Sequence, residues 1–290
     1  MKVTGFTIAR NVVKFDYPIK EAIESILPIC DQFLILVGDS EDDTLAYLQS
    51  FNNPKIIIKE SVWNETLQDG GKVLAVETDK AFQMIDADTN WCFYIQADEV
   101  VHEKYLPVIK AGMQNNVSNK KIDGLLFKYL HFYHSYNYIA KSSRFYKHEI
   151  RIVRNDKSIF SYIDAQGFRK GDNQKLNVAK LNAFIYHYGW VRPPVHMKAK
   201  QESIMKYYHN QEHIDEVIGE EDAFDYTQFN FYIESFNGTH PALMQNRVNA
   251  MDWPFDPNQY RKELLPKEKF KKAMRKYLGI NLEYANYKLV

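Results

Sequence analysis

The sequence predicts an α/β fold in which a mixed, mainly parallel central sheet is flanked by helices and followed by a helical C-terminal extension. In the first third of the chain, short apolar runs alternate with segments of helical periodicity, the pattern of right-handed crossovers between parallel strands. These runs lack the polar alternation of half-exposed strands, as expected of strands buried on both faces. Hydrophobic residues make up 45% of the 290 residues, which is ample for a core.

Four strands and three helices account for the first hundred residues. Pro18 suits the first turn of a helix whose apolar stripe includes Ile23 and Ile26. Gly70 and Gly71 precede a further helix with apolar inward positions. We expect strands at residues 3–9, 33–37, 55–59 and 91–95, separated by helices that start at Pro18, near residue 43 and after Gly71.

The pattern changes after Pro107, where strands rich in aromatic residues predict a mixed or antiparallel extension of the sheet. Pro193 and Pro194 open a helix that runs to about residue 210. The chain therefore divides into a main domain at residues 1–210 and a helical or irregular extension at residues 211–290, packed on it. We expect strands at 122–133, 149–154, 158–168 and 183–188, a solvated acidic segment at 212–225 and an irregular connection at 237–257.

The basic tail from Pro266 is expected to form a helix with Phe270, Met274, Tyr277 and Leu278 on one face. We expect this helix to dock its apolar stripe on its own domain and to leave its lysines in water. The alternative is peripheral contact with an anionic membrane surface, which a basic amphipathic helix also suits.

Composition excludes several classes of protein. A formal net charge of zero argues against a general nucleic-acid binder held by phosphate electrostatics. Cys30 and Cys92 are too few for a disulfide framework and are typical of buried thiols in a reducing compartment. The sequence shows no signal peptide, and no apolar run approaches the ~20 residues needed to cross a bilayer. We therefore expect a cytoplasmic protein.

Three polar clusters follow the predicted strands. Arg10 and Asn11 end the first strand, residues 38–43 end the second, and residues 96–99 end the fourth. The carboxyl ends of parallel strands share one edge of the sheet, where open α/β sheets bind ligands. Three converging clusters predict a single binding site at that edge.

Asp98 and Glu99 directly follow the buried run at residues 91–95. Asp98 suits a hard divalent cation, whose usual partners are carboxylates and phosphate oxygens. The alternative is that the two carboxylates only cap the next helix. Their place among the three converging clusters favours the site.

Four motifs, in this order and at this spacing, resemble those of family 2 glycosyltransferases with the GT-A nucleotide-sugar fold. They are FTIARN at 6–11, CDQFLILVGDSEDDT at 30–44, YIQADE at 94–99 and YHYGW at 186–190. The resemblance covers roughly residues 3–192. It implies an inverting transferase that uses a nucleotide-diphosphate sugar and a divalent cation, Mn²⁺ or Mg²⁺. It implies metal binding by Asp98 and His187, and donor binding by Thr7, Ala9, Arg10, Asn11, Gly38, Asp39, Asp42, Gln96 and Ala97.

The chain departs from the family pattern at two positions. Gln96 stands where the family often has Asp and supplies only a neutral oxygen, so a metal would rest on Asp98, His187 and the donor's phosphates. This departure puts the metal itself in doubt. Gly38 stands where many relatives carry an acid that faces the base, and Asp39 or Asp42 is expected to take that role. For His187 the alternative is a core histidine with a satisfied ring.

Basic residues near these motifs are candidates for holding the leaving diphosphate. Arg192 and Lys198 follow the His187 strand and would add fixed positive charge there. The alternative is ordinary surface charge at a helix start. Lys72 and Trp63 are expected near the donor if the helix after Gly71 points its N-terminus at the site.

Asp164 is the candidate catalytic base. It lies in the polar turn SYIDAQGFR and resembles the acid that follows the acidic motif in the family. A carboxylate within hydrogen-bond reach can accept the proton of an attacking hydroxyl. The alternative is an ordinary turn aspartate beside Gly167.

These features together predict sugar transfer from a nucleotide-diphosphate sugar to a glycan or lipid-linked acceptor, as in cell-surface polysaccharide biosynthesis. The alternative, motivated by Gln96, is a catalytically degenerate protein of the same fold that binds nucleotide or glycan, or acts as a scaffold. A nucleotidyltransferase is a weaker alternative. It usually has a glycine-rich loop after the first strand, and IARNVVKFDYP at 8–18 contains no glycine.

Overall fold

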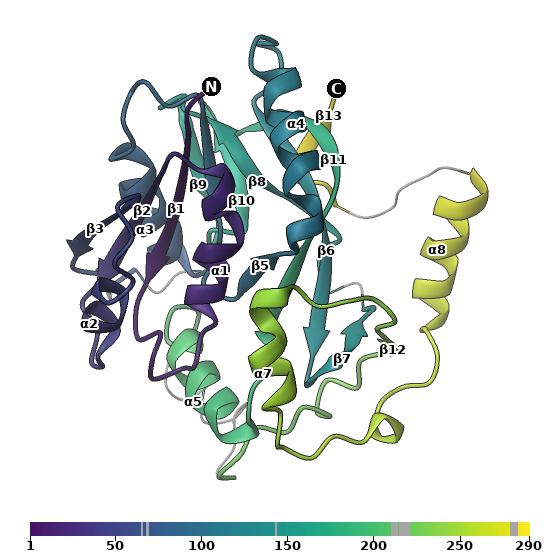
Figure 1. Ribbon diagram of the computed structural model, residues 1–290. Helices are drawn as coiled ribbons and strands as arrows, with labels where there is room; N and C mark the ends of the chain where they lie inside the picture. Colours follow the sequence, from purple (N-terminus) through teal and green to yellow (C-terminus); the bar gives the residue numbers. More distant parts are fainter. Residues whose placement is uncertain (65, 68–69, 143, 210–213, 215–220, 279–283) are drawn as a thin grey trace.

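Four parallel strands form one half of a long mixed sheet in the computed structural model (Figure 1), which describes residues 1–64, 66–67, 70–142, 144–209, 214, 221–278 and 284–290. Their order is β3-β2-β1-β4, and all three neighbouring pairs are parallel. The first four predicted strands are thereby confirmed. The strands are β1 (Val3–Ala9), β2 (Gln32–Gly38), β3 (Ile56–Ser61) and β4 (Trp91–Tyr94).

The second half of the sheet is largely antiparallel. The order continues β4-β8-β6-β11-β10-β9, with antiparallel pairs from β4 through β8 to β6, a parallel pair between β6 and β11, and antiparallel pairs beyond. The mixed α/β class is confirmed, whereas the parallel arrangement is largely a property of the N-terminal half. The strands are β5 (Glu99–Val101), β6 (Gly124–Tyr133), β7 (Ser135–Ala140), β8 (His148–Arg154), β9 (Ile159–Tyr162), β10 (Gly167–Lys170) and β11 (Gln174–Trp190).

Two of the predicted strands differ from those observed. Residues 158–168 form a hairpin turn between β9 and β10 instead of one strand. Ile163 and Ala165 at this turn have positive φ angles of 57° and 62°, which breaks the extended backbone. The short strand predicted at 183–188 is one end of the 17-residue β11. Its other end, which pairs with β6, β10 and β13, alternates exposed or partly exposed residues with buried ones, which hides the strand from an apolar-run criterion.

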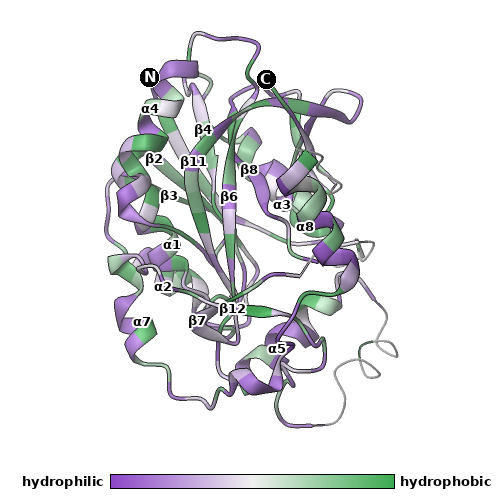
Figure 2. Ribbon diagram, turned by 90° about the vertical axis from the view of Figure 1, so that its right-hand side faces the viewer, coloured by the Kyte–Doolittle hydropathy of each residue, from purple (hydrophilic) through white to green (hydrophobic). Residues whose placement is uncertain are grey.

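Helices cover both faces of the sheet. Figure 2 shows hydrophobic residues along the strands and on the helix sides that face them. One core contains Ile23 and Ile26 of α1 together with Met113 of α4, and the other contains Phe82 of α3. The helical elements of this half are α1 (Ile19–Ile26), η1 (Leu27–Ile29), α2 (Thr44–Gln49), α3 (Lys72–Gln83), η2 (Glu103–Tyr105) and α4 (Leu106–Asn116).

The C-terminal third packs on β6, β7 and β11 through two aromatic clusters. Phe132 and Tyr188 stack at 4.8 Å between ring centroids, and Tyr133 meets Tyr226 and Phe231 nearby. The predicted helix after Pro193 is α5, which ends at Met205, short of residue 210. Much of the acidic segment predicted at 212–225 lies outside the described residues. The remaining elements are α5 (Pro194–Met205), β12 (Ile233–Ser235), η3 (Ala242–Met244), α7 (Gln245–Asn249), η4 (Pro257–Gln259), α8 (Pro266–Leu278) and β13 (Tyr287–Leu289).

The basic helix α8 forms as expected, but it stands off from the body of the molecule (Figure 1). Phe270 and Tyr277 on its apolar face are 59% and 74% exposed. The expectation that this face docks on the domain is therefore wrong. Within the described part of the chain, none of the helices combines the length and apolar character that a membrane crossing requires.

Candidate active site

A cavity of about 300 Å³ lies at the carboxyl edge of β1 and β4, where the sequence predicts a site. Parallel pairing of β1 with β4 brings the segments after both strands to the same edge. The end of β11 and the helix α5 close the opposite side. Predicted residues in the lining are Ala9, Arg10, Asn11, Trp63, Gln96, Ala97, Asp98, Asp164 and His187, and Trp190, Lys200, Tyr207 and Tyr208 join them.

The end of α5 and the two tyrosines after it cover the cavity. The N–H of Gly71 donates to the carbonyl of Tyr207 at 2.9 Å. Gly71 has φ 73° and precedes α3, and an added Cβ would come within 2.6 Å of Tyr208 and 2.8 Å of Asp164. Only glycine therefore suits this position, because it needs both a left-handed backbone and no side chain. The predicted helix start does lie at the rim of the site.

Asp98 lies at the centre of the cavity beside a buried lysine. Lys200 Nζ donates to Asp98 Oδ2 at 3.0 Å and to the carbonyl of Gly189 at 2.8 Å. His187 Nε2 lies 3.7 Å from Asp98 Oδ1. The N–H of Tyr188 donates to the carbonyl of Asp98 at 2.8 Å, which fixes the loop after β4 against β11.

Charge and burial compete at this pair. Burial by itself would raise the pKa of Asp98, but the nearby charges of Lys200 and Arg192 outweigh it and hold the pKa well below its usual range. Burial lowers the pKa of Lys200 to about 8, and the charge of Arg192 acts in the same direction. The two groups thus form an ion pair at neutral pH inside a partly desolvated site.

The tautomer of His187 follows from its neighbour His131. His131 Nε2 lies 2.7 Å from the carbonyl of Tyr146, so this nitrogen carries the proton and donates. Burial keeps the pKa of His131 well below its usual value, so its Nδ1 is an acceptor. His187 Nδ1 lies 3.1 Å from that nitrogen and must be the donor. The unprotonated Nε2 of neutral His187 therefore faces Asp98.

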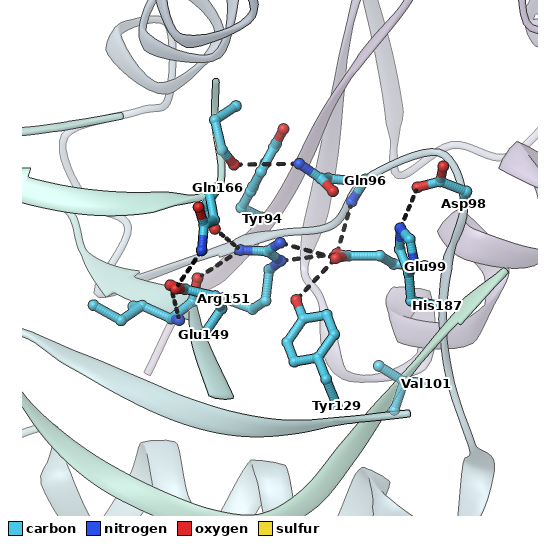
Figure 3. A network of polar contacts seen from close by, with 12 residues as sticks. Tyr94, Gln96, Asp98, Glu99, Val101, Tyr129, Glu149, Arg151, Gln166 and His187 are labelled. Carbon is cyan, nitrogen blue, oxygen red and sulfur yellow. Dashed lines mark hydrogen bonds and ion pairs between the residues drawn. The ribbon is translucent and has the colours of Figure 1, made fainter. Parts of the chain in front are cut away.

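Glu99, next to Asp98, points into the wall instead of the cavity (Figure 3). Arg151 binds both of its carboxylate oxygens at 2.8 Å, and Tyr129 donates to Oε1 at 2.8 Å. Arg151 and Glu99 are both fully buried. This network makes Glu99 a structural residue, neither a helix cap nor a ligand of the site.

Gln96 has a role that an aspartate could not fill. Its amide Nε2 donates to the carbonyl of Ala165 at 3.2 Å, and so ties the end of β4 to the turn that carries Asp164. A carboxylate has no proton to donate at neutral pH. The departure from the family motif thus joins the two acidic sides of the cavity.

The donor set around Asp98 does not fit a resident divalent cation. The described residues contain no group of three or more His, Cys, Asp or Glu side chains that could hold a metal. Asp98 and His187 are two ligands at most, and one oxygen of Asp98 already binds the ammonium of Lys200. A metal would have to displace this lysine.

Asp164 lies in the turn between β9 and β10 and faces the cavity. Tyr208 donates its hydroxyl to Asp164 Oδ2 at 2.9 Å, while Oδ1 is buried with no hydrogen-bond partner among the described residues. Positive φ angles at Ile163 and Ala165 flank it. Such a backbone is unusual for a β-branched residue and is often found where a side chain must be held in place for function.

Arg10 joins the floor of the cavity to its cover. Its guanidinium donates to the carbonyl of Asp39 at 2.8 Å and to the hydroxyl of Tyr207 at 3.2 Å, and lies 5.4 Å from the ring centroid of Trp63. Gly38 lies beneath that ring, since an added Cβ would come within 2.2 Å of Trp63 Nε1. Asp39 and Gly38 therefore shape the cavity wall from behind its lining.

Two further predicted donor-binding residues serve the surrounding backbone. Asp42 accepts hydrogen bonds from the N–H groups of Lys14 at 2.7 Å and Thr44 at 3.0 Å, which fixes the loops after β1 and β2 against each other. Thr7 is buried within β1.

The predicted basic residues take different positions. Lys72 is exposed. Lys198 is half-buried; its Nζ donates to the carbonyl of Glu221 and lies 3.8 Å from Glu202. Arg192 is buried behind the ring of Tyr17; its Nη1 donates to a backbone carbonyl at 2.8 Å, and its Nε and Nη2 have no partner among the described residues.

Sequence reasoning missed Lys200, although the signal was present. Met197 is fully buried, and Lys200 and Ile204 follow it at spacings of three and four residues. These three positions share one face of a helix, whereas Lys198 lies on another. A lysine on the buried face of an otherwise weakly amphipathic helix was the clue.

No protein-family model matches the chain, and no curated protein matches it. Similar solved structures include S. aureus TarS, with 14% identity and a TM-score of 0.40 over 76% of this chain and 42% of TarS. The chain thus spans less than half of that TarS chain. TarS 1–349 has been crystallised with UDP and with UDP-GlcNAc.

Two other similar structures have different activities. The 4-diphosphocytidyl-2C-methyl-D-erythritol synthase of Anaerococcus prevotii has 8% identity and a TM-score of 0.34, over 53% of this chain and 70% of its own. Glucosyl-3-phosphoglycerate synthase of Mycobacterium tuberculosis, in complex with Mn²⁺, UDP-glucose and phosphoglyceric acid, has 15% identity and a TM-score of 0.30, over 46% of this chain and 44% of its own. Because these scores lie below 0.5, the resemblance to family 2 glycosyltransferases stays a prediction, and the functional argument rests on the site.

Proposed function

We propose that this protein transfers a glycosyl group, with inversion, from a nucleotide-diphosphate sugar to a hydroxyl of a glycan or lipid-linked acceptor. The observation that carries the proposal is the convergence, in one cavity, of buried cations, aromatic walls and a carboxylate with an unpartnered oxygen. Each of these features matches one requirement of the reaction.

The cations match the leaving group. As the bond from the anomeric carbon to the diphosphate breaks, the electron pair and negative charge pass to a phosphate oxygen. Lys200 and Arg10 both lie in the lining and would stabilise this charge. The rings of Trp63 and Tyr207, 5.9 Å apart, offer flat surfaces to the nucleoside.

Asp164 matches the base. In the proposed step the acceptor hydroxyl oxygen bonds to the anomeric carbon while its proton passes to Asp164 Oδ1, which has no other hydrogen-bond partner among the described residues. The hydrogen bond from Tyr208 to Oδ2 holds the carboxylate in orientation. Protein groups supply every charge in this step, so it contains no metal ion.

A second candidate function is a nucleotide-binding or scaffolding module on a degenerate transferase fold. The observation that favours it is the use of Gln96 as a structural tie to Ala165. In that case the cavity would bind nucleotide without turnover.

Calorimetric titration with uridine and guanosine diphosphates, with and without Mn²⁺, followed by an assay of donor hydrolysis, tests both functions. We expect binding of one nucleotide and slow release of sugar from the matching donor. Binding without hydrolysis or transfer would favour the scaffold. No binding of either nucleotide under any condition would end the transferase proposal.

A further inference from the structure

We infer that Lys200 is the resident cation of the donor site and takes the place that a divalent metal ion would otherwise hold beside Asp98. This inference rests on the proposed function and names the group that binds the donor's diphosphate. Three observations support it: the seat of the ammonium, the local balance of charge, and the orientation of His187.

The ammonium of Lys200 lies in a buried position that is defined by several contacts. The residue is 5% exposed, and its Nζ contacts Asp98, the carbonyl of Gly189 and the face of Tyr17, whose ring centroid is 4.8 Å away. Gly189 makes this seat possible, because an added Cβ would come within 2.7 Å of Asp98 Oδ2 and 2.6 Å of the His187 ring. A long polar side chain is rarely buried unless its charge is matched in this way.

The charge balance around this seat favours an anion. Lys200 and Arg192 flank the ring of Tyr17 at 4.8 and 4.9 Å, and both lower the pKa of Asp98. Asp98 is the carboxylate they share, while Arg192 contacts a carbonyl and keeps two nitrogens without a partner among the described residues. A divalent ion would add charge of the same sign to this group, whereas a diphosphate would balance it.

The orientation of His187 gives the inference a sharp test. Its unprotonated Nε2 faces Asp98 Oδ1 at 3.7 Å, so the two side chains resemble half of a metal site. Lys200 holds the other carboxylate oxygen and thereby excludes the metal. We therefore expect that replacing Lys200 leaves Asp98 and His187 available to bind a metal ion.

The experiment measures free Mn²⁺ by electron paramagnetic resonance, and nucleotide affinity by calorimetry in EDTA or Mn²⁺. Wild-type protein should leave Mn²⁺ free at millimolar concentration and bind nucleotide equally well under both conditions. Lys200→Ala should lose at least tenfold in nucleotide affinity in EDTA, take up one Mn²⁺, and regain affinity with it. Adding His187→Ala to this variant should abolish the uptake, whereas Lys206→Ala, at an exposed position after α5, should behave as wild type.

Stoichiometric Mn²⁺ binding by the wild type, or loss of its nucleotide binding in EDTA, would overturn the inference. Lys200→Met keeps the length of the side chain, so it replaces the alanine variant if thermal melting shows that variant to be unfolded. If no protein binds nucleotide, the proposed function fails. Even then, Mn²⁺ uptake by Lys200→Ala but not by the wild type would support Lys200 as the group that occupies the cation position.

A second inference comes from α8, at the opposite side of the molecule. We propose that this helix lies on an anionic lipid surface. Most of its apolar face points away from the body: Phe270, Tyr277 and Leu278 are 59%, 74% and 63% exposed, whereas Met274 at the border is partly buried, as are Glu268 and Lys271 on the inner side. A helix that only packs on its own domain would instead direct its apolar face toward that domain.

The charge of α8 indicates which kind of surface its apolar face binds. Its 13 residues contain five lysines and one arginine against one glutamate, in a chain whose net charge is zero. Glu268 is engaged with Arg261 at 3.4 Å. Two such helices would repel each other, which disfavours a second copy of the chain, whereas anionic headgroups attract the lysines that border the apolar stripe.

Co-sedimentation with phosphatidylcholine vesicles, with and without 30% phosphatidylglycerol, tests this proposal. We expect binding to the anionic vesicles that weakens with salt, and at least tenfold loss in Phe270→Ser/Tyr277→Ser. Val108→Ser, an exposed apolar position on α4, is the matched control and should bind as wild type. Equal binding to neutral vesicles, no binding, or loss of a protein dimer in the double variant would overturn it.

Discussion

Asp98 and Glu99 are adjacent in sequence and each forms an ion pair, yet the two pairs have opposite surroundings. Glu99 meets Arg151 in the wall through two parallel hydrogen bonds of 2.8 Å, with both groups fully buried. Asp98 meets Lys200 in the cavity through one contact of 3.0 Å. The segment after β4 therefore directs Asp98 into the site, whereas Glu99, the first residue of β5, points into the fold.

The difference lies in the chemistry of the cations. Arginine presents a rigid planar fork that saturates a carboxylate, and Glu99, despite the opposing effect of burial, raises the pKa of Arg151 well above its ordinary value. Lysine presents a point charge, and here burial lowers its pKa to about 8. A saturated pair can only hold structure, whereas an ammonium with one carboxylate partner still has charge to offer a ligand.

The largest effect is expected from Arg151→Met. It leaves Glu99 buried without a cation, so we expect a loss of about 3–5 kcal/mol in the free energy of unfolding. Urea denaturation measures it, and Arg151→Met/Glu99→Gln should recover part of the loss. A loss below about 1 kcal/mol would show that the wall pair is no more structural than the cavity pair.

Asp98→Asn should act mainly on turnover. Without its carboxylate Lys200 loses the partner that favours its charged form, so we expect about a 10³-fold lower rate of transfer. The buried lysine also costs stability, by about 1–3 kcal/mol, because a polar contact becomes imperfect. Steady-state kinetics with a thermal melt checks both, and retained turnover would remove Asp98 from the site.

Asp164→Asn extends the comparison to a carboxylate of the cavity whose hydrogen-bond donor is the hydroxyl of Tyr208. We expect kcat to fall about 10²-fold with donor affinity nearly unchanged, because the group acts mainly in the transition state. Kinetics and nucleotide calorimetry separate the two quantities. An equal loss of donor binding would instead assign Asp164 to the nucleotide pocket.

Glu149→Gln extends the comparison to the wall. Burial raises the pKa of Glu149 to about 7 against 4.5 when unfolded, so its protonated form is the one that suits the fold. The wild type should therefore lose stability as pH rises from about 4.5 to 7, and the amide should not. We expect the variant to be more stable by about 1–2 kcal/mol above pH 7 and equal to the wild type below pH 4. Unfolding curves at both pH values check the sign.

The sequence was sufficient for the parallel half of the sheet and for the edge where the site lies. Apolar runs such as the one before Gln96 are visible because both faces of β1, β2 and β4 are buried. The expectation of burial on both faces was wrong for β3, which lies at the end of the strand order and alternates partly buried and exposed residues. It was insufficient for β11, whose first half alternates exposed or partly exposed residues with buried ones. The docking of α8 was wrong because amphipathicity defines a face without saying what covers it.

Within the site, sequence reasoning named Asp98, Asp164, Arg10 and His187, which the fold brings into one cavity. It named Lys198 and missed Lys200, because the choice between them depends on which face of α5 turns inward. It also could not assign Gln96, whose partner Ala165 is far away in the chain. Partners across sheets and turns are properties of packing, not of local pattern.

The contact between Gly71 and Tyr207 has a kinetic consequence. It ties the segment after α5 to the start of α3. If product leaves the cavity only when this contact opens, its release would limit the rate of turnover. Turnover would then slow in viscous solvent even though the chemistry is unaffected. A side chain at position 71 would weaken this contact, so product would be held for a shorter time and turnover would be faster.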